Sequence, residues 1–247
     1  MNRPKENLPD WYGISVKDMN SFQVTASLTD GLITPANLID AASLLGERAA
    51  NKAILDGHRR MVEAGNNRDE FLAGADLKSI GLMSGFPLSL VDKADGVVAN
   101  LTGTKSPLGE AVDGTRDFLA TWIKIQTRLR IGEITPLQAA SLGLPKIINA
   151  AIATHEKFGK GEFHTSLGGK IGEAAAVGSV VLADIVELHG TKLRIKGVKA
   201  GVMPHEVMSP EFLEDNTSYD TLAKMKDAAF TSQFTGRLAV SLLSLVK

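Results

Sequence analysis

The feature that most constrains this chain is a helical periodicity of its apolar residues. The period is clearest after Ser106-Pro107, where apolar side chains recur at steps of three and four residues as far as about Ile131: Leu108, Ala111, Val112, Phe118, Leu119, Trp122, Ile125 and Leu129. This spacing places them on one face of an α-helix. Because a similar period runs through most of the 247 residues, we predict an all-α protein.

The expected helices are marked by Thr-Pro and Ser-Pro pairs, since Thr or Ser caps a helix and proline is tolerated in its first turn. Glycine and asparagine clusters, such as Gly65-Asn66-Asn67, indicate turns between helices. Residues 173–188 are apolar on nearly all sides, which is typical of a helix at the centre of a core. We predict helices over residues 35–46, 47–64, 68–84, 88–101, 107–131, 135–158, 173–188 and 219–246.

The order of these helices predicts two helical lobes arranged around the long 107–131 helix. We expect an N-terminal arm over 1–24, an N-terminal lobe over 25–105, a central and C-terminal lobe with a basic cleft over 106–218, and a C-terminal helix or arm over 219–247. One strand signal interrupts the helical pattern: Lys192-Leu193-Arg194-Ile195-Lys196 alternates cations with aliphatic residues. Strict alternation is typical of a β-strand, and it predicts one small β element near 191–203.

Several kinds of chemistry lack the residues that they need. The chain has no cysteine, so thiol catalysis and zinc-thiolate sites are excluded. Its five histidines have no metal-ligand spacing, and no Gly-x-Ser-x-Gly sequence is present. We therefore predict no metal, no cofactor and no catalytic residue. Gly168-Gly169-Lys170 resembles a phosphate-binding loop only in composition, and with His164 it leaves open a helical enzyme that acts on a small anionic substrate.

The charges are unevenly distributed although the net charge is −1. Residues 120–200 carry eleven Lys or Arg against six Asp or Glu, a local excess of +5, and the flanking regions are acidic. Cations gathered into one cleft would bind single-stranded RNA or DNA through its phosphates. The predicted nucleic-acid-binding residues are Lys124, Arg128, Arg130, Lys157, Lys160, Lys170, Lys192, Arg194 and Lys196. An ordinary solvated surface, or cations favoured at helix C termini, would explain the same pattern.

The N-terminal arm combines polar, proline-containing sequence with four large apolar side chains: Trp11, Tyr12, Ile14 and Phe22. A segment of this composition cannot form a core of its own and is normally ordered only by docking on something else. We predict that these residues mediate homo-oligomerisation. The longest apolar stretch, 174–183, is shorter than the roughly 20 residues that cross a bilayer, so no membrane insertion is expected.

These observations favour a self-assembling nucleoprotein or coat subunit, located in the cytoplasm or incorporated in a virion or filament. Its arms would link neighbouring copies and its basic cleft would hold single-stranded nucleic acid. Two alternatives stay open at this point: the enzyme mentioned above, and a structural assembly protein that binds no nucleic acid. An enzyme would form a small closed oligomer, whereas either assembly protein would form a large particle.

Overall fold

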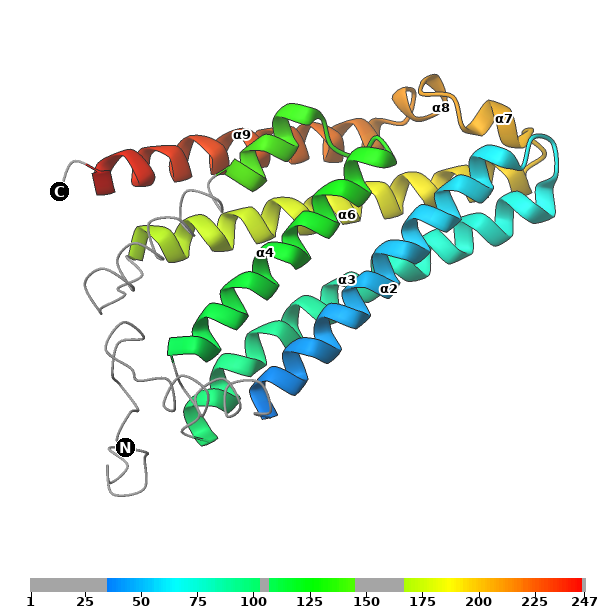
Figure 1. Ribbon diagram of the computed structural model, residues 1–247. Helices are drawn as coiled ribbons and strands as arrows, with labels where there is room; N and C mark the ends of the chain where they lie inside the picture. Colours follow the sequence, from blue (N-terminus) through cyan, green and yellow to red (C-terminus); the bar gives the residue numbers. More distant parts are fainter. Residues whose placement is uncertain (1–34, 103–106, 145–166, 246–247) are drawn as a thin grey trace.

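The computed structural model describes the backbone of residues 35–102, 107–144 and 167–245, and all of its regular structure is helical (Figure 1). The prediction of an all-α fold is confirmed. The long helices are α2 (Pro35–Glu63), α3 (Arg68–Thr102), α4 (Pro107–Arg130), α6 (Leu167–Lys199) and α9 (Thr217–Leu245). Two single-turn helices, α7 (Pro204–Val207) and α8 (Glu211–Glu214), lie between α6 and α9, and residues 136–144 form a further helical segment.

The small β element expected near 191–203 is wrong, because residues up to Lys199 belong to α6. Five alternating residues are too few to separate a strand from a helix when tertiary packing favours one of them. In the helix, Lys192 and Lys196 are four residues apart and both are exposed, while Arg194 turns to the opposite side and is largely buried. The alternation therefore reflects a helix with one exposed face and one largely buried face.

Proline and capping residues start the helices where the sequence predicts. Pro35 and Pro107 are the first residues of α2 and α4. Thr135 begins the 136–144 segment with a reciprocal cap: its hydroxyl accepts from the backbone N–H of Gln138 at 3.2 Å, and the Gln138 side chain accepts from the Thr135 N–H at 3.0 Å. Both otherwise unpaired donors at this helix end are thus satisfied.

Two pairs of expected helices are continuous. Residues 35–46 and 47–64 form α2, and residues 68–84 and 88–101 form α3, which continues through Pro87. Glycine within a helix costs about 1 kcal/mol relative to alanine, but here it allows α2 and α3 to approach closely. A Cβ on Gly57, Gly74 or Gly81 would lie within 3 Å of backbone atoms of the opposite helix. The glycines that weaken each helix locally are therefore required by the packing between them.

α2, α4 and α6 run in one direction and α3 and α9 run back, and the two ends of the bundle differ (Figure 1). At one end, α2 turns into α3 at Gly65, which has the positive φ of 55° that glycine tolerates, and α7 and α8 lie nearby. At the other end lie the N termini of α2, α4 and α6 and the C termini of α3 and α9, and α4 separates from α6 toward this end. We call these the closed end and the open end.

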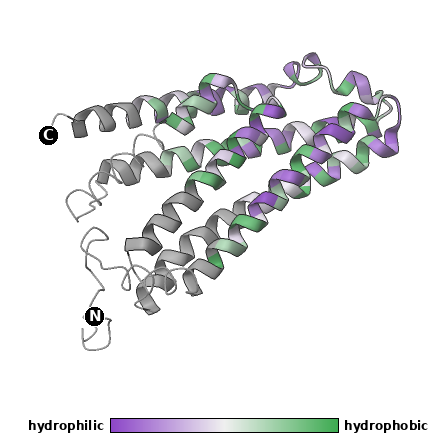
Figure 2. Ribbon diagram, in the orientation of Figure 1, coloured by the Kyte–Doolittle hydropathy of each residue, from purple (hydrophilic) through white to green (hydrophobic). Residues whose placement is uncertain are grey.

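Two large apolar clusters, and a smaller one formed by Ile54, Leu82 and Ile131, hold the helices together. The first lies at the closed end, where Met61, Phe71 and Val198 pack with Val207 of α7. The second joins Ile125 of α4 to the 136–144 segment, α6 and Phe230 of α9. Figure 2 shows that apolar and polar residues alternate along each helix, as amphipathic packing requires. Among the described helices, none is both long enough and apolar enough to cross a membrane.

The expected arm over 1–24 lies outside the described residues, and so do residues 145–166, which include the second half of the helix expected over 135–158. The C-terminal helix expected from 219 is seen as α9, which begins at Thr217. It packs along α6 and contributes Phe230 to the second apolar cluster. Its described part is thus integral to the bundle.

Candidate functional site: a buried charged layer

The most unusual feature of the described structure is a set of charged side chains inside the bundle, between the two apolar clusters. They come from α2, α3, α4, α6 and the turn after α4, and each is buried or largely buried. We call this set the charged layer; its members are Glu47, Lys78, Lys124, Arg128, Glu133, Asp184, Glu187 and Arg194. Charged groups are rarely buried unless they are paired.

Arg128 is the centre of one half of the charged layer. Its guanidinium donates to the carboxylate of Asp184 on α6 and, at 3.3 Å, to the amide oxygen of Asn51 on α2. The Glu133 carboxylate lies 3.6 Å from its Nε. Arg128 therefore ties α4 to α2 and α6 at once, and only 3% of its side chain is exposed.

A second ion pair in this half sets the alignment of α2 and α4. The Lys124 ammonium donates to the Glu47 carboxylate at 2.6 Å. The Glu47–Lys124 and Asn51–Arg128 contacts each join residues 77 positions apart in the chain. Equal spacing in two successive turns means that α2 and α4 run parallel and in step.

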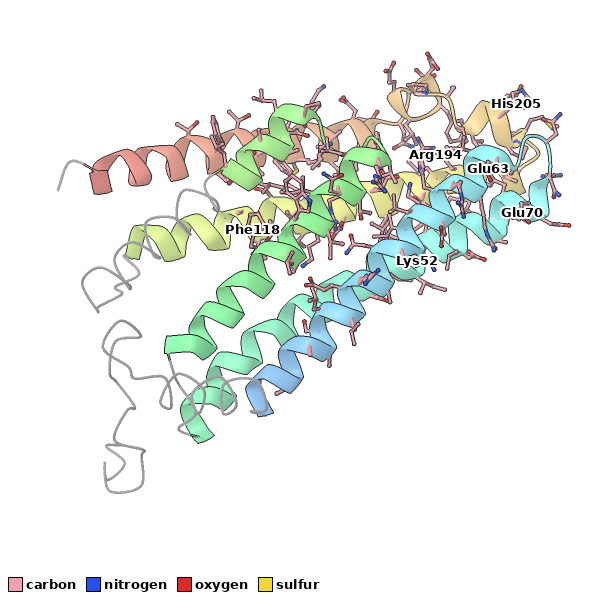
Figure 3. The ribbon with its side chains drawn as sticks, viewed as in Figure 1. Lys52, Glu63, Glu70, Phe118, Arg194 and His205 are labelled. Carbon is pink, nitrogen blue, oxygen red and sulfur yellow. The ribbon has the colours of Figure 1, made fainter. Side chains whose placement is uncertain are left out.

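Lys78 is the centre of the other half. It is completely buried, it donates to the Glu187 carboxylate, and it lies 3.1 Å from Nδ1 of His58. Arg194, labelled in Figure 3, approaches the same carboxylate with its Nη1 at 4.0 Å and donates from Nε to the backbone oxygen of Val207 at 3.0 Å. This half joins α2, α3, α6 and α7.

The half around Arg128 contains three carboxyl groups and two cations, so one charge lacks a counterpart. Burial raises the pKa of Glu133 to about 8, although Arg128 opposes the shift. Burial also raises the pKa of Asp184, again against the effect of Arg128. Neither carboxyl oxygen of Glu133 has a hydrogen-bond partner. We infer that Glu133 retains a proton at neutral pH and balances this half.

The half around Lys78 has the opposite imbalance, because it contains two cations, Lys78 and Arg194, and one carboxyl group, Glu187. Burial, followed by the nearby Lys78 ammonium, lowers the pKa of His58 to about 4, so its imidazole is neutral and can accept from Lys78. Burial alone would raise the pKa of Glu187, but the Lys78 ammonium lowers it below its ordinary value. Glu187 is therefore held as a carboxylate and His58 as a neutral ring.

This arrangement suits positioning of helices better than reaction chemistry. In the described parts of the chain, no three or more His, Asp or Glu residues gather where they could hold a metal ion. The acids and bases of the layer contact one another, the side chains of Asn51 and His58, and the backbone. Buried ion pairs of this kind are best known for fixing the register and partner choice of helices.

The nine cations predicted to bind nucleic acid occupy different places. Lys124, Arg128 and Arg194 belong to the charged layer and pair with carboxylates. Arg130, Lys192 and Lys196 are exposed. Lys170 lies in the first turns of α6 together with Gly168 and Gly169, and only its backbone is described, while Lys157, Lys160 and His164 lie outside the described residues. Trp11, Tyr12, Ile14 and Phe22 also lie outside them.

The carboxylates that pair with these cations were missed by the sequence analysis. Asp184 and Glu187 are acids within a helix that is otherwise apolar on nearly all sides. A buried carboxylate requires a cationic partner, and this signal was available. The identity of the partner was not, because Asp184 and Arg128 are 56 residues apart.

Comparison of the chain with protein-family models, curated proteins and solved structures finds no match.

Proposed function

We propose that this protein is a structural subunit that assembles with further copies of itself, as the subunits of a coat or filament do. The observation that carries the proposal is the amount of apolar surface left exposed on the described helices. The large exposed side chains are Leu45, Val62, Ile80, Met83, Leu119, Trp122, Leu137, Leu144, Val177, Ile185 and Met225. Where such side chains form a contiguous patch, they typically mark a surface through which a chain associates.

The charged layer supports this proposal over a polyanion-binding cleft. Three of the cations on which such a cleft would depend pair internally with buried carboxylates. Their electrostatic attraction therefore acts within the bundle. A bundle whose register is set by internal ion pairs is a suitable rigid unit for a repeating assembly.

Light scattering of the purified full-length chain, measured after size exclusion over a wide concentration range, tests the proposal. We expect a mass several times that of one chain, rising with concentration. Nuclease treatment should leave the mass unchanged if protein contacts alone hold the particle together. A mass of one chain at every concentration would contradict the proposal.

A second candidate is a nucleoprotein, in which the assembled subunits also bind single-stranded nucleic acid. Lys192, Lys196 and Lys199 are exposed and recur at steps of four and three along α6. They therefore share one outer stripe of the helix, and in an assembly such stripes from successive copies could follow a phosphate backbone.

Paired variants test the second candidate. Lys192→Glu with Lys196→Glu should weaken binding of unrelated single-stranded RNA sequences about equally and reduce the dependence of binding on salt. Lys224→Glu is the matched control, because Lys224 is an exposed lysine of α9 that already pairs with Asp220. The nucleoprotein would be contradicted if the double variant bound RNA as tightly as the wild type. It would also be contradicted if the purified assembly showed no absorbance from nucleic acid. A purely structural assembly would then remain.

A further inference from the structure

The side of α4 that enters the second apolar cluster continues beyond that cluster toward the open end. Ile125 is 4% exposed and packs against the 136–144 segment, α6 and α9. Trp122 and Phe118 stand three and seven residues earlier, and hence on the same side of the helix. Trp122 is nevertheless 47% exposed, and Leu119 beside it is 44% exposed. We call Phe118, Leu119 and Trp122 the α4 stripe.

The stripe loses its cover because α4 and α6 separate. Arg128 and Asp184 hold the two helices together, and toward the open end their ribbons move apart (Figure 1). Phe118, labelled in Figure 3, lies on this diverging part of α4. The rings of Phe118 and Trp122 stack with centroids 6.4 Å apart and planes inclined by 13°. The pair therefore forms a preordered aromatic surface whose outer side is exposed.

From this geometry we infer that the α4 stripe is the docking site for residues 11–22 of a neighbouring copy, an inference that rests on the proposed self-assembly. That segment holds Trp11, Tyr12, Ile14 and Phe22. Tryptophan and tyrosine are the side chains most enriched at the energetic centres of interfaces. Aromatic residues make up only 5% of the chain, and its two tryptophans are the one in this segment and the one in the stripe.

The position of the N-terminal segment in the chain agrees with this docking. Residues 1–34 precede Pro35, the first residue of α2. The spacing of 77 residues between paired positions of α2 and α4 places Pro35 level with Val112, on the open-end side of the stripe. Twelve residues separate Phe22 from Pro35, and an extended chain of that length spans roughly 40 Å. The segment can therefore leave the bundle at the open end and reach an adjacent copy.

Disulfide trapping tests the inference, because the natural chain contains no cysteine. One full-length chain carries Gly13→Cys, between Tyr12 and Ile14, and a second carries Leu119→Cys, which leaves Phe118 and Trp122 in place. The matched control replaces the second chain by Arg130→Cys, at the exposed C-terminal end of the same helix. Docking raises the effective thiol concentration from roughly ten micromolar to roughly one millimolar, so we expect the 13–119 dimer to form roughly 100-fold faster than the 13–130 dimer.

The outcomes separate this inference from the proposed function. Equal trapping rates in a chain that still assembles would overturn the docking site and leave self-assembly standing. A monomeric wild type would overturn both. An internal disulfide in the Gly13→Cys/Leu119→Cys double variant, diluted in excess wild type, would place the arm on its own bundle and overturn docking between copies.

A substitution in the stripe gives an independent measurement. Trp122→Glu should lower the assembled fraction at a fixed concentration at least as strongly as deletion of residues 1–24, with the helical circular dichroism unchanged. Lys224→Glu, on the exposed face of α9, is the control for added negative charge on an exposed position. Full assembly of the Trp122→Glu variant would contradict the role of the stripe. If the variant instead loses its helical signal, the trapping rates above still test docking, because they are measured with Trp122 in place.

Discussion

The apolar cluster at the closed end and the charged layer beside it share α2, α3 and α6, yet they stabilise the bundle in different ways. At the closed end, Met61, Phe71 and Val198 exclude water and need only complementary shapes. In the charged layer, Arg128 must meet Asp184 and Glu133, and Lys78 must meet Glu187. Apolar contacts depend on shape, whereas these ion pairs also require each charge to face its own partner. The comparison suggests that apolar burial stabilises the bundle and that the charged layer selects its arrangement.

The largest expected loss of stability follows from removing the centre of the charged layer. Arg128→Leu leaves Asp184 buried without its cation, which typically costs about 3–5 kcal/mol in the free energy of unfolding. Urea denaturation measures this loss. Arg130→Leu, two residues later and exposed, is the control and should change stability by less than about 0.5 kcal/mol. Similar values for the two variants would mean that the layer contributes no constraint.

A large loss is also expected in the apolar cluster, but without dependence on pH. Met61→Ala removes a completely buried side chain between α2, α3 and α6 and should cost about 2–5 kcal/mol. Denaturation at several pH values should give the same difference from wild type each time, because no titrating group is removed. A loss that changes steeply with pH would show that the cluster and the charged layer are coupled.

The pH dependence of stability should originate in the charged layer, on Glu133. Burial raises the pKa of Glu133 from its ordinary value of 4.5 to about 8. Between these values the folded state binds more protons than the unfolded state, so the contribution of Glu133 is complete below 4.5 and is lost as the pH rises through about 8. Glu133→Gln should remove this loss of stability between pH 4.5 and about 8, which is on the order of a few kcal/mol. Glu214→Gln, at an exposed position, should retain it.

The smallest net effect is expected from replacing a whole ion pair by apolar residues. Lys78→Met alone leaves Glu187 with only the more distant Arg194 and should destabilise the bundle strongly. Lys78→Met with Glu187→Leu removes both buried charges and leaves Arg194 its hydrogen bond to the Val207 backbone oxygen, so the double variant should unfold within about 1 kcal/mol of wild type. A double-mutant cycle measures the coupling between the two sites. A double variant as unstable as the single one would mean that the pair stabilises the fold as well as selecting it.

Local signals in the sequence were sufficient for the helices and many of their ends. Apolar residues recur at three- and four-residue steps up to Leu129, and prolines stand at 35 and 107. Both signals concern only residues within one or two helix turns. Even so, Lys192 to Lys196 was predicted to be a strand. Its alternation is local, but the burial of Arg194 against Glu187 and Val207 depends on other helices.

By itself, then, the sequence determined that this chain is helical, where most helices begin, and that acids such as Asp184 lie in an apolar segment and need partners. Only the tertiary structure decided which partners those are, since Lys78 meets Glu187 across 109 residues and Lys124 meets Glu47 across 77. It also decided which part of the α4 apolar face is covered and which is exposed at Trp122. The reason is physical: helix formation depends on residues within a turn or two, whereas charge pairing and burial depend on groups that meet only after the helices have packed.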